Sequence, residues 1–118
     1  MYISYSYIFL GRKIMSEVKV YCIANVLIKD AETFRGYEKG FFGTIAEHNG
    51  QFLTMDDHPN HLEGTSPIKG RVIMWTFSNE EDLNNWYNSD NYQELSNKYR
   101  RPATELVNLT VVKGMPAR

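Results

Sequence analysis

Three segments of this chain carry the β-branched and aromatic residues that favour strands: KVYCIANVLI at 19–28, RVIMWTF at 71–77 and ELVNLTVVKG at 105–114. A shorter segment, QFLTMDD at 51–57, has the same character. The first segment is apolar on both sides, interrupted only by Asn25, and a strand of that kind is expected to be covered on both faces.

A long helix is predicted after the first strand. Apolar residues from Phe34 to Ile45 recur at spacings of three and four, which indicates a helix over about 31–49 with Asp30 as its N-cap. Three glycines share one side of this helix. They either let another backbone approach closely or mark a weak, solvated helix, and the second interpretation is slightly favoured: Gly36, Gly40 and Gly43.

The second helical region is expected in two pieces. Ser78 and Glu81 form the S-x-x-E pattern of a capping box, which predicts a helix start directly after Ser78. Ser89 or Asp90 can cap a second piece. The aromatic stretch NNWYNSDNYQEL at 84–95 is therefore favoured as a joint between two helices over a ligand site.

The order strand, helix, strand, strand, helix, strand is the βαββαβ pattern of ferredoxin-like α+β domains. We expect one such domain over residues 19–114, with a four-stranded antiparallel sheet, and a short tail over 115–118. Two helices cover only one face of that sheet, yet the first strand is apolar on the other. A homodimer joined through the sheet face is the economical way to bury it.

The first 18 residues are expected to be an extension of this domain. MYISYSYIFLGRKI, residues 1–14, places its charges after a short apolar run, which is the reverse of a secretory signal. The sequence from Met15 onward resembles a natural protein start. We therefore expect an upstream start codon or a loosely held extension.

Composition limits the partners. The chain has 118 residues and a formal net charge of -1, so a nucleic-acid footprint or a polybasic membrane patch is not expected. No apolar run approaches the roughly 20 residues of a membrane-spanning helix. The single cysteine, Cys22, cannot form an internal disulfide and lies in an apolar run, which favours a buried core residue and a reducing, cytoplasmic setting.

The segment HPNHLE contains His58, His61 and Glu63, residue types that can hold a divalent metal. A proline-containing loop without cysteine partners or a clear fourth ligand makes a solvated loop the favoured interpretation. We expect no metal and no cofactor.

Glu63 is the candidate for a catalytic base. It lies across a predicted hairpin from Arg71, and arginines end the second helix at 100 and 101. A carboxylate facing a guanidinium forms either a structural ion pair, which is the commoner case, or one wall of a polar pocket. The residues considered for ligand binding are Asn25, Arg71, Trp86, Tyr87, Tyr92 and Arg100.

The stretches YCIANVLIKDAETFRGYEKGFFGTIAEHNGQFL, LEG and RVIMWTFSNEEDLNNWYNSDNYQELSNKYR resemble a family of small bacterial proteins, domain of unknown function 1330. The most specific pieces are Glu63-Gly64, WYNSDNY at 86–92 and an arginine that falls at Arg100 or Arg101. Thr76 stands where the family often has a glutamate. The resemblance implies a dimeric α+β barrel and no established reaction.

Three functions follow from these observations. The first is a dimer that binds a small organic ligand in a cleft between helices and sheet, with Glu63 and an arginine as polar contacts. The second is a cofactor-free monooxygenase- or isomerase-like enzyme, a class that occurs among similar folds, with Glu63 as base. The third is a structural or stress-related dimer without a site.

Overall fold

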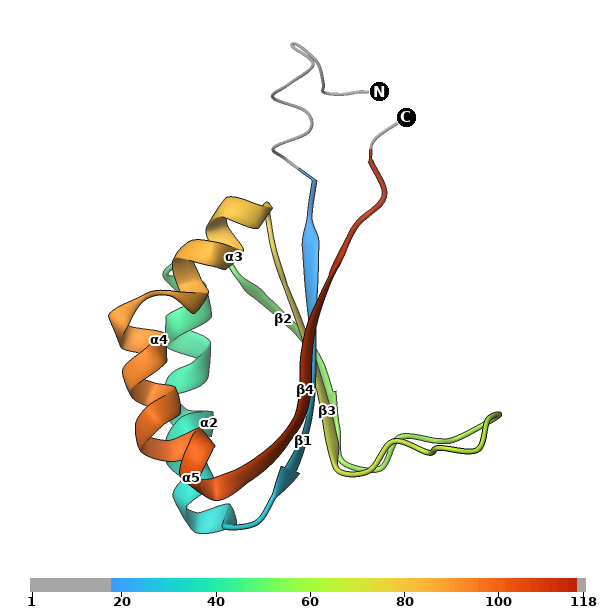
Figure 1. Ribbon diagram of the computed structural model, residues 1–118. Helices are drawn as coiled ribbons and strands as arrows, with labels where there is room; N and C mark the ends of the chain where they lie inside the picture. The colour runs from blue at the N-terminus through green and yellow to red at the C-terminus, as the bar shows by residue number, and fades with distance from the viewer. Residues whose placement is uncertain (1–17, 117–118) are drawn as a thin grey trace.

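The computed structural model describes residues 18–116 (Figure 1). The expectations for the N-terminal extension and for a start at Met15 lie outside the described residues. The elements, in chain order, are β1 (Val20–Ile28), α2 (Ala31–Ala46), β2 (Gln51–Asp56), β3 (Arg71–Phe77), α3 (Glu80–Tyr87), α4 (Asp90–Leu95), the π-helical turn η1 (Ser96–Arg100), α5 (Arg101–Ala103) and β4 (Thr104–Lys113).

The four strands form one antiparallel sheet in the order β2-β3-β1-β4. All the described helices lie on one face of it, and the other face is bare (Figure 1). This is the predicted ferredoxin-like βαββαβ arrangement. Two β-bulges interrupt the register, one after Asn25 in the pairing of β1 with β4 and one after Phe52 in the pairing of β2 with β3.

Three of the described helices, α2, α3 and α4, begin at polar caps, two of which were predicted. Asp30 accepts a hydrogen bond from the backbone N–H of Thr33, and Ser89 accepts one from Tyr92. The predicted cap at Ser78 is wrong by one residue. Asn79 caps α3 instead, because its side chain reaches the backbone N–H of Asp82 at 2.8 Å. The joint between α3 and α4 is therefore a capped turn, as expected.

Two of the three glycines of α2 are sites of close packing, which corrects the interpretation as a solvated helix. A Cβ at Gly36 would collide with the ring of Tyr99, and one at Gly40 would lie 2.6 Å from Leu95. A Cβ at Gly43 would meet nothing within 4 Å. The second helical region thus packs against α2 at the first two positions and not at the third.

These positions predict opposite effects of the same substitution. Gly43→Ala should stabilise the protein by about 0.5–1 kcal/mol, because alanine favours helix and fits. Gly36→Ala should destabilise it by about 1–3 kcal/mol through overpacking against Tyr99. Urea unfolding of the two variants checks this; stabilisation by both would contradict the packing described.

The bare face of the sheet is mostly apolar at its centre. Alternation along β1 and β3 places Val20, Cys22 and Trp75 in the core, so the intervening residues lie on the bare face. Those with large apolar side chains are Tyr21, Ile23, Leu27, Val72 and Met74, and all of them are only partly covered.

Residues 57–70, here called the arm, connect β2 to β3. The arm extends away from the body on the side opposite the helices (Figure 1). Asn25 holds its base, since the side-chain amide donates to the carbonyl oxygens of Lys69 at 2.8 Å and Arg71 at 3.2 Å. Near the tip, a ring nitrogen of His61 lies 2.7 Å from the carbonyl oxygen of Gly64.

Candidate functional site

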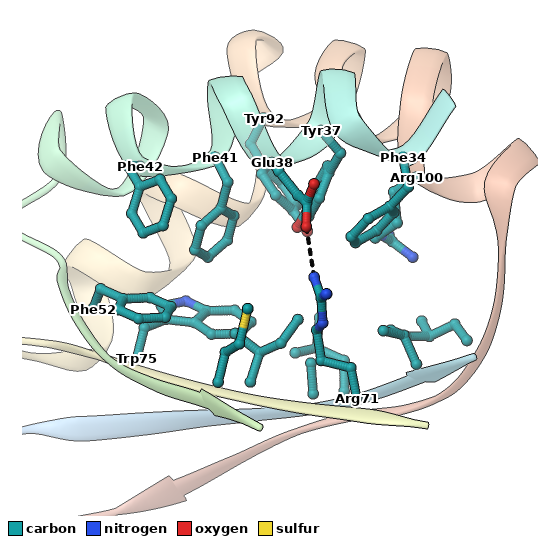
Figure 2. A pocket seen from close by; sticks show the side chains of 16 residues that line it. Phe34, Tyr37, Glu38, Phe41, Phe42, Phe52, Arg71, Trp75, Tyr92 and Arg100 are labelled. Carbon is teal, nitrogen blue, oxygen red and sulfur yellow. Dashed lines mark hydrogen bonds and ion pairs between the residues drawn. The ribbon is translucent and has the colours of Figure 1, made fainter. Parts of the chain in front are cut away.

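A cavity of about 190 Å³ lies between α2 and the sheet. Its wall is largely aromatic and aliphatic, with two arginines and one carboxylate (Figure 2). The lining residues that the site depends on are Phe34, Tyr37, Glu38, Phe41, Arg71, Trp75, Tyr92 and Arg100. A mostly apolar pocket with a few polar groups is the kind that takes small organic ligands.

The helix α2 supplies the roof of the cavity. Phe34, Tyr37 and Phe41 follow a spacing of three and four, so all three point down toward the sheet (Figure 2). The Phe41 ring packs edge-on against Trp75 of β3, with centroids 5.0 Å apart. The apolar stripe predicted from the sequence is therefore both core and cavity wall.

Arg71 lies where the cavity meets solvent, and both of its partners are acidic. It donates to Glu38 at 2.6 Å and to Asp57 at 2.7 Å, whose side chains are 40% and 48% exposed. The hydrogen bond from Arg71 lowers the pKa of Asp57. The charge of Arg71 is thus neutralised within the protein, and the residue joins α2 to the base of the arm.

Arg100 is placed in the cavity by the π-helical turn η1. Arg100 is only 5% exposed. The next residue, Arg101, is exposed and donates hydrogen bonds to Gln93 and Asn97 on the outer surface. The guanidinium of Arg100 lies beside the ring of Tyr37, 5.9 Å from its centroid (Figure 2). Single π-helical turns occur often at functional sites. The sequence left open whether Arg100 or Arg101 is the arginine of interest, and it is Arg100 that lines the cavity.

No carboxylate neutralises Arg100 within the described part of the chain, where the four ion pairs involve other residues. Its Nε is buried without a hydrogen-bond partner. A buried charge without a counter-charge is costly in an apolar setting. The indole Nε1 of Trp75, which also lines the cavity, is buried without a partner as well, so Arg100 is the charged member of two lining groups that the described residues leave unsatisfied.

Two tyrosine hydroxyls lie in the same region. The hydroxyls of Tyr37 and Tyr92 are 3.0 Å apart and buried. Burial raises the pKa of Tyr37 well above its usual value, although the nearby charge of Arg100 acts in the opposite direction. Tyr37 therefore keeps its proton at neutral pH. Since one hydroxyl of the pair donates to the other, the second has a hydrogen left for another acceptor.

A second, more open cleft of about 530 Å³ lies between α3 and β4. Arg100, Leu106 and Leu109 line both the cleft and the cavity, so Arg100 stands between them. Of the residues predicted for ligand binding, Trp86 and the exposed Tyr87 line this cleft. The Trp86 indole is already used, since it donates to the Thr44 hydroxyl at 3.1 Å.

Of the predicted site residues, the structure places Arg71, Tyr92 and Arg100 in the wall of the cavity. Trp86 and Tyr87 do not line it, although their rings pack against Tyr92 from the side of the second cleft. Asn25 lies outside the cavity and serves the arm. Glu63 is exposed on the arm, and the expected pair with Arg71 is not formed, because Arg71 binds Glu38 and Asp57. A catalytic role for Glu63 stays a prediction, without support from the cavity of its own subunit.

The sequence interpretation missed two polar contributors to the cavity, Tyr37 and Glu38. Tyr37 was assigned only to the apolar stripe of the helix. It lies three residues after Phe34 on the same side of α2, and this spacing indicated an unusually aromatic face. Glu38 was not considered, because nothing in the sequence shows that it faces Arg71, 33 residues away.

Cys22 is fully buried beneath the helices, and burial raises the pKa of its thiol to about 12. We expect a disulfide reagent at pH 8 to modify the folded protein only as fast as it opens, because the thiolate is the nucleophile. In the unfolded chain the thiol has its usual pKa of 9.0 and ionises as the pH rises past that value, whereas the folded thiol stays protonated. This group therefore lowers the free energy of unfolding as the pH rises from 9 toward 12.

Comparing Cys22→Ala with the wild type by urea unfolding at pH 8 and pH 10.5 isolates that effect. The wild type should lose more stability than the variant over this interval. Rapid modification of the folded protein at pH 8 would contradict the burial of the thiol.

Within residues 18–116, no cluster of three or more His, Cys, Asp or Glu side chains is arranged to hold a metal ion. None of the described helices has the length and apolar character needed to cross a membrane.

The fold and the cavity together define a ferredoxin-like α+β protein of the class found in dimeric α+β barrels. The chain belongs to the family Domain of unknown function (DUF1330), which it matches over residues 19–115. No match was found among curated proteins.

Solved structures with the same fold have low sequence identity to this chain. RPA0582, a protein of unknown function from Rhodopseudomonas palustris, aligns with a TM-score of 0.64 at 12% identity over 93% of each chain. SnoaB, a cofactor-independent oxygenase from Streptomyces nogalater, aligns at 0.59 and 8% identity over 85% of this chain and 96% of its own. A dimeric ferredoxin-like protein of unknown function from Jannaschia sp. CCS1 aligns at 0.53 and 14% identity, covering 82% and 98%.

Proposed function

We propose that this protein binds a small organic molecule with one negatively charged group in the cavity between α2 and the sheet. The observation that carries the proposal is Arg100, a buried guanidinium that lines an apolar cavity and has no carboxylate partner among the described residues. A carboxylate or similar anion on the ligand would supply the missing counter-charge.

The other lining residues narrow the class of ligand. Arg71 is paired with two acids, so Arg100 is the one lining cation without a carboxylate partner among the described residues, which favours a ligand with a single anionic group. The free hydroxyl hydrogen of the Tyr37–Tyr92 pair suits a second acceptor atom on the ligand. The aromatic walls favour a flat, apolar body.

The volume of the cavity limits the ligand to about one ring. An apolar protein cavity of about 150 Å³ holds benzene. The cavity here, about 190 Å³, leaves space for one ring with a short substituent. We therefore infer a monocyclic aromatic carboxylate, or an aliphatic acid of similar size, as the preferred class.

Binding of benzoate, measured by calorimetry and thermal shift, tests this proposal. Benzamide has nearly the same shape without the charge, and 1-naphthoate has the charge on two rings. We expect benzoate to bind more tightly than either. Equal binding of benzamide would contradict the role assigned to Arg100, and tighter binding of naphthoate would contradict the size limit.

Homodimer formation through the bare face of the sheet is the second part of the proposal. It is supported by the partly exposed apolar residues of β1 and β3 and by the dimeric neighbour from Jannaschia sp. CCS1. Light scattering at micromolar concentrations should give twice the mass of one chain. A stable monomer would contradict it.

An enzyme of the cofactor-independent oxygenase type is the alternative. A cation with two tyrosine hydroxyls can stabilise negative charge that develops on a substrate oxygen, which is the observation in its favour. Turnover of a bound acid, lost in Glu63→Gln, would support this alternative. If no organic acid binds, a dimer without a small-molecule site becomes the better explanation.

A further inference from the structure

The arm is fixed at its base by contacts with three other elements. Asn25 of β1 binds the carbonyl oxygens of Lys69 and Arg71, and Asp57 is paired with Arg71, which also binds α2. Gly70 has φ +85°, and a side chain there would collide with the backbone of Val26. The direction in which the arm leaves the sheet is therefore determined by the folded domain.

The far part of the arm presents apolar side chains to solvent. Leu62 is 84% exposed, more than any other large apolar residue described, and Ile68 is 54% exposed. The neighbouring turn is held by the contact between His61 and Gly64. One exposed leucine is ordinary by itself, but here it lies on a projection with a fixed direction beside the partly exposed apolar face of the sheet, and together they enlarge the apolar surface on that side.

The bare face has a modest projected area. Four strands about 4.8 Å apart, each about 25 Å long, cover roughly 500 Å² in projection. A standard interface buries about 800 Å² of accessible surface on each partner, so a contact confined to this face would lie toward the small end. The arm lies on the same side as the bare face and would add to the buried area (Figure 1).

Length determines where the arm can go. Each limb has about seven residues and reaches up to roughly 20 Å, whereas facing sheets pack about 10 Å apart. The arm therefore cannot fit between two stacked sheets and has to pass beside an edge. We propose that the arm of each subunit passes the sheet edge of a second copy and buries Leu62 against the flank of that copy.

The proposal rests on the homodimer proposed above. It adds the contact of the arm of each subunit, through Leu62, with the other subunit, here called the clasp. A two-fold axis makes the contact occur twice, because each subunit is both donor and receiver of an arm. Glu63 is adjacent to Leu62, so each subunit would present its Glu63 to the other subunit and not to its own cavity. Any function of Glu63 would then depend on the dimer.

Leu62→Asp tests the clasp. Burial of two leucines per dimer predicts that this variant raises the dissociation constant of the dimer at least roughly 100-fold, measured by sedimentation. Ala31→Asp is the matched control, because it also replaces an exposed apolar residue by aspartate but lies at the start of α2. It should leave the dissociation constant within a few-fold of the wild-type value.

A fluorescent label at the tip gives an independent measurement. The chain has one cysteine, Cys22, which is buried, so an environment-sensitive dye would react with Leu62→Cys at position 62 alone. Its emission should be blue-shifted in the dimer and shift to the red on dilution into monomers.

The outcomes separate the two proposals. In one outcome the wild type is a dimer, Leu62→Asp dimerises equally well and the dye at position 62 has red-shifted, water-exposed emission at every concentration. That result would contradict the clasp and leave the sheet-face dimer intact. If the wild type is a monomer at all concentrations, both are wrong. Benzoate binding by the monomer would leave the ligand proposal intact.

Discussion

The Arg100→Met variant should be more stable than the wild-type protein and should no longer bind benzoate. Methionine matches the length of the arginine stem and removes the buried charge that lacks a counter-ion. Replacing buried charges with apolar side chains is often stabilising by about 1–4 kcal/mol. We expect an increase of about 1–4 kcal/mol in the free energy of unfolding, measured by urea unfolding without ligand.

Loss of binding should accompany that gain. Truncating one partner of a buried charge pair weakens binding by about 2–5 kcal/mol, which corresponds to at least roughly 30-fold in the dissociation constant. Arg101→Met is the control, because Arg101 is the next residue along the chain and is exposed on the outer surface. It should change neither stability nor binding measurably. Retention of benzoate affinity by Arg100→Met would remove Arg100 from the site.

Gly70→Ala should be among the most destabilising single-methyl additions in the chain. Gly70 has φ +85°, and the added Cβ would collide with the carbonyl oxygen of Val26. The left-handed conformation costs about 1–2 kcal/mol for an L-residue. The collision adds about 1–3 kcal/mol. We therefore expect a loss of about 2–5 kcal/mol in the free energy of unfolding.

Gly64→Ala is the comparison that isolates the collision. Gly64 also has a positive φ, +103°, but a Cβ there would meet only His61 at 3.6 Å. It should lose only the conformational part, about 1–2 kcal/mol. Equal losses in the two variants would show that the base of the arm is not packed against β1 as described.

The order of elements followed directly from the sequence because hydrophobic periodicity depends on local burial. β1, β3 and β4 each carry a continuous apolar pattern, and α2 has its stripe and its cap at Asp30. The cap of α3 was misplaced from Asn79 to Ser78, because adjacent residues with the same capping chemistry cannot be separated by pattern.

The site was only partly predictable, because its geometry depends on features without a local signal. A π-helical turn adds one residue to a helical repeat, so the register of Arg100 against Arg101 could not be obtained from a period of 3.6. Glu63 was expected to face Arg71 across a hairpin. The arm projects away from the sheet instead, and residues from α2 and the arm base took the place of Glu63.

The role of Asn25 illustrates the same limit. An amide within an apolar strand needs a partner, and that much follows from its chemistry. The partners are backbone carbonyl oxygens of Lys69 and Arg71, more than 40 residues away. Backbone groups look alike in every sequence, so the pattern could not distinguish these carbonyl oxygens from a neighbouring strand, a water, a second subunit or a ligand.

The π-helical turn changes how an extra residue in this segment affects the binding site. A π-helical turn holds one residue more per hydrogen-bonded repeat than an α-helix, in which each residue turns the chain by about 100°. Deleting Asn97, an exposed residue of η1, would therefore restore an ordinary α-helical repeat and leave Arg100 directed toward the cavity. Within one family, chains with and without this extra residue could keep an arginine at the same place in the cavity, although their sequences align with a gap.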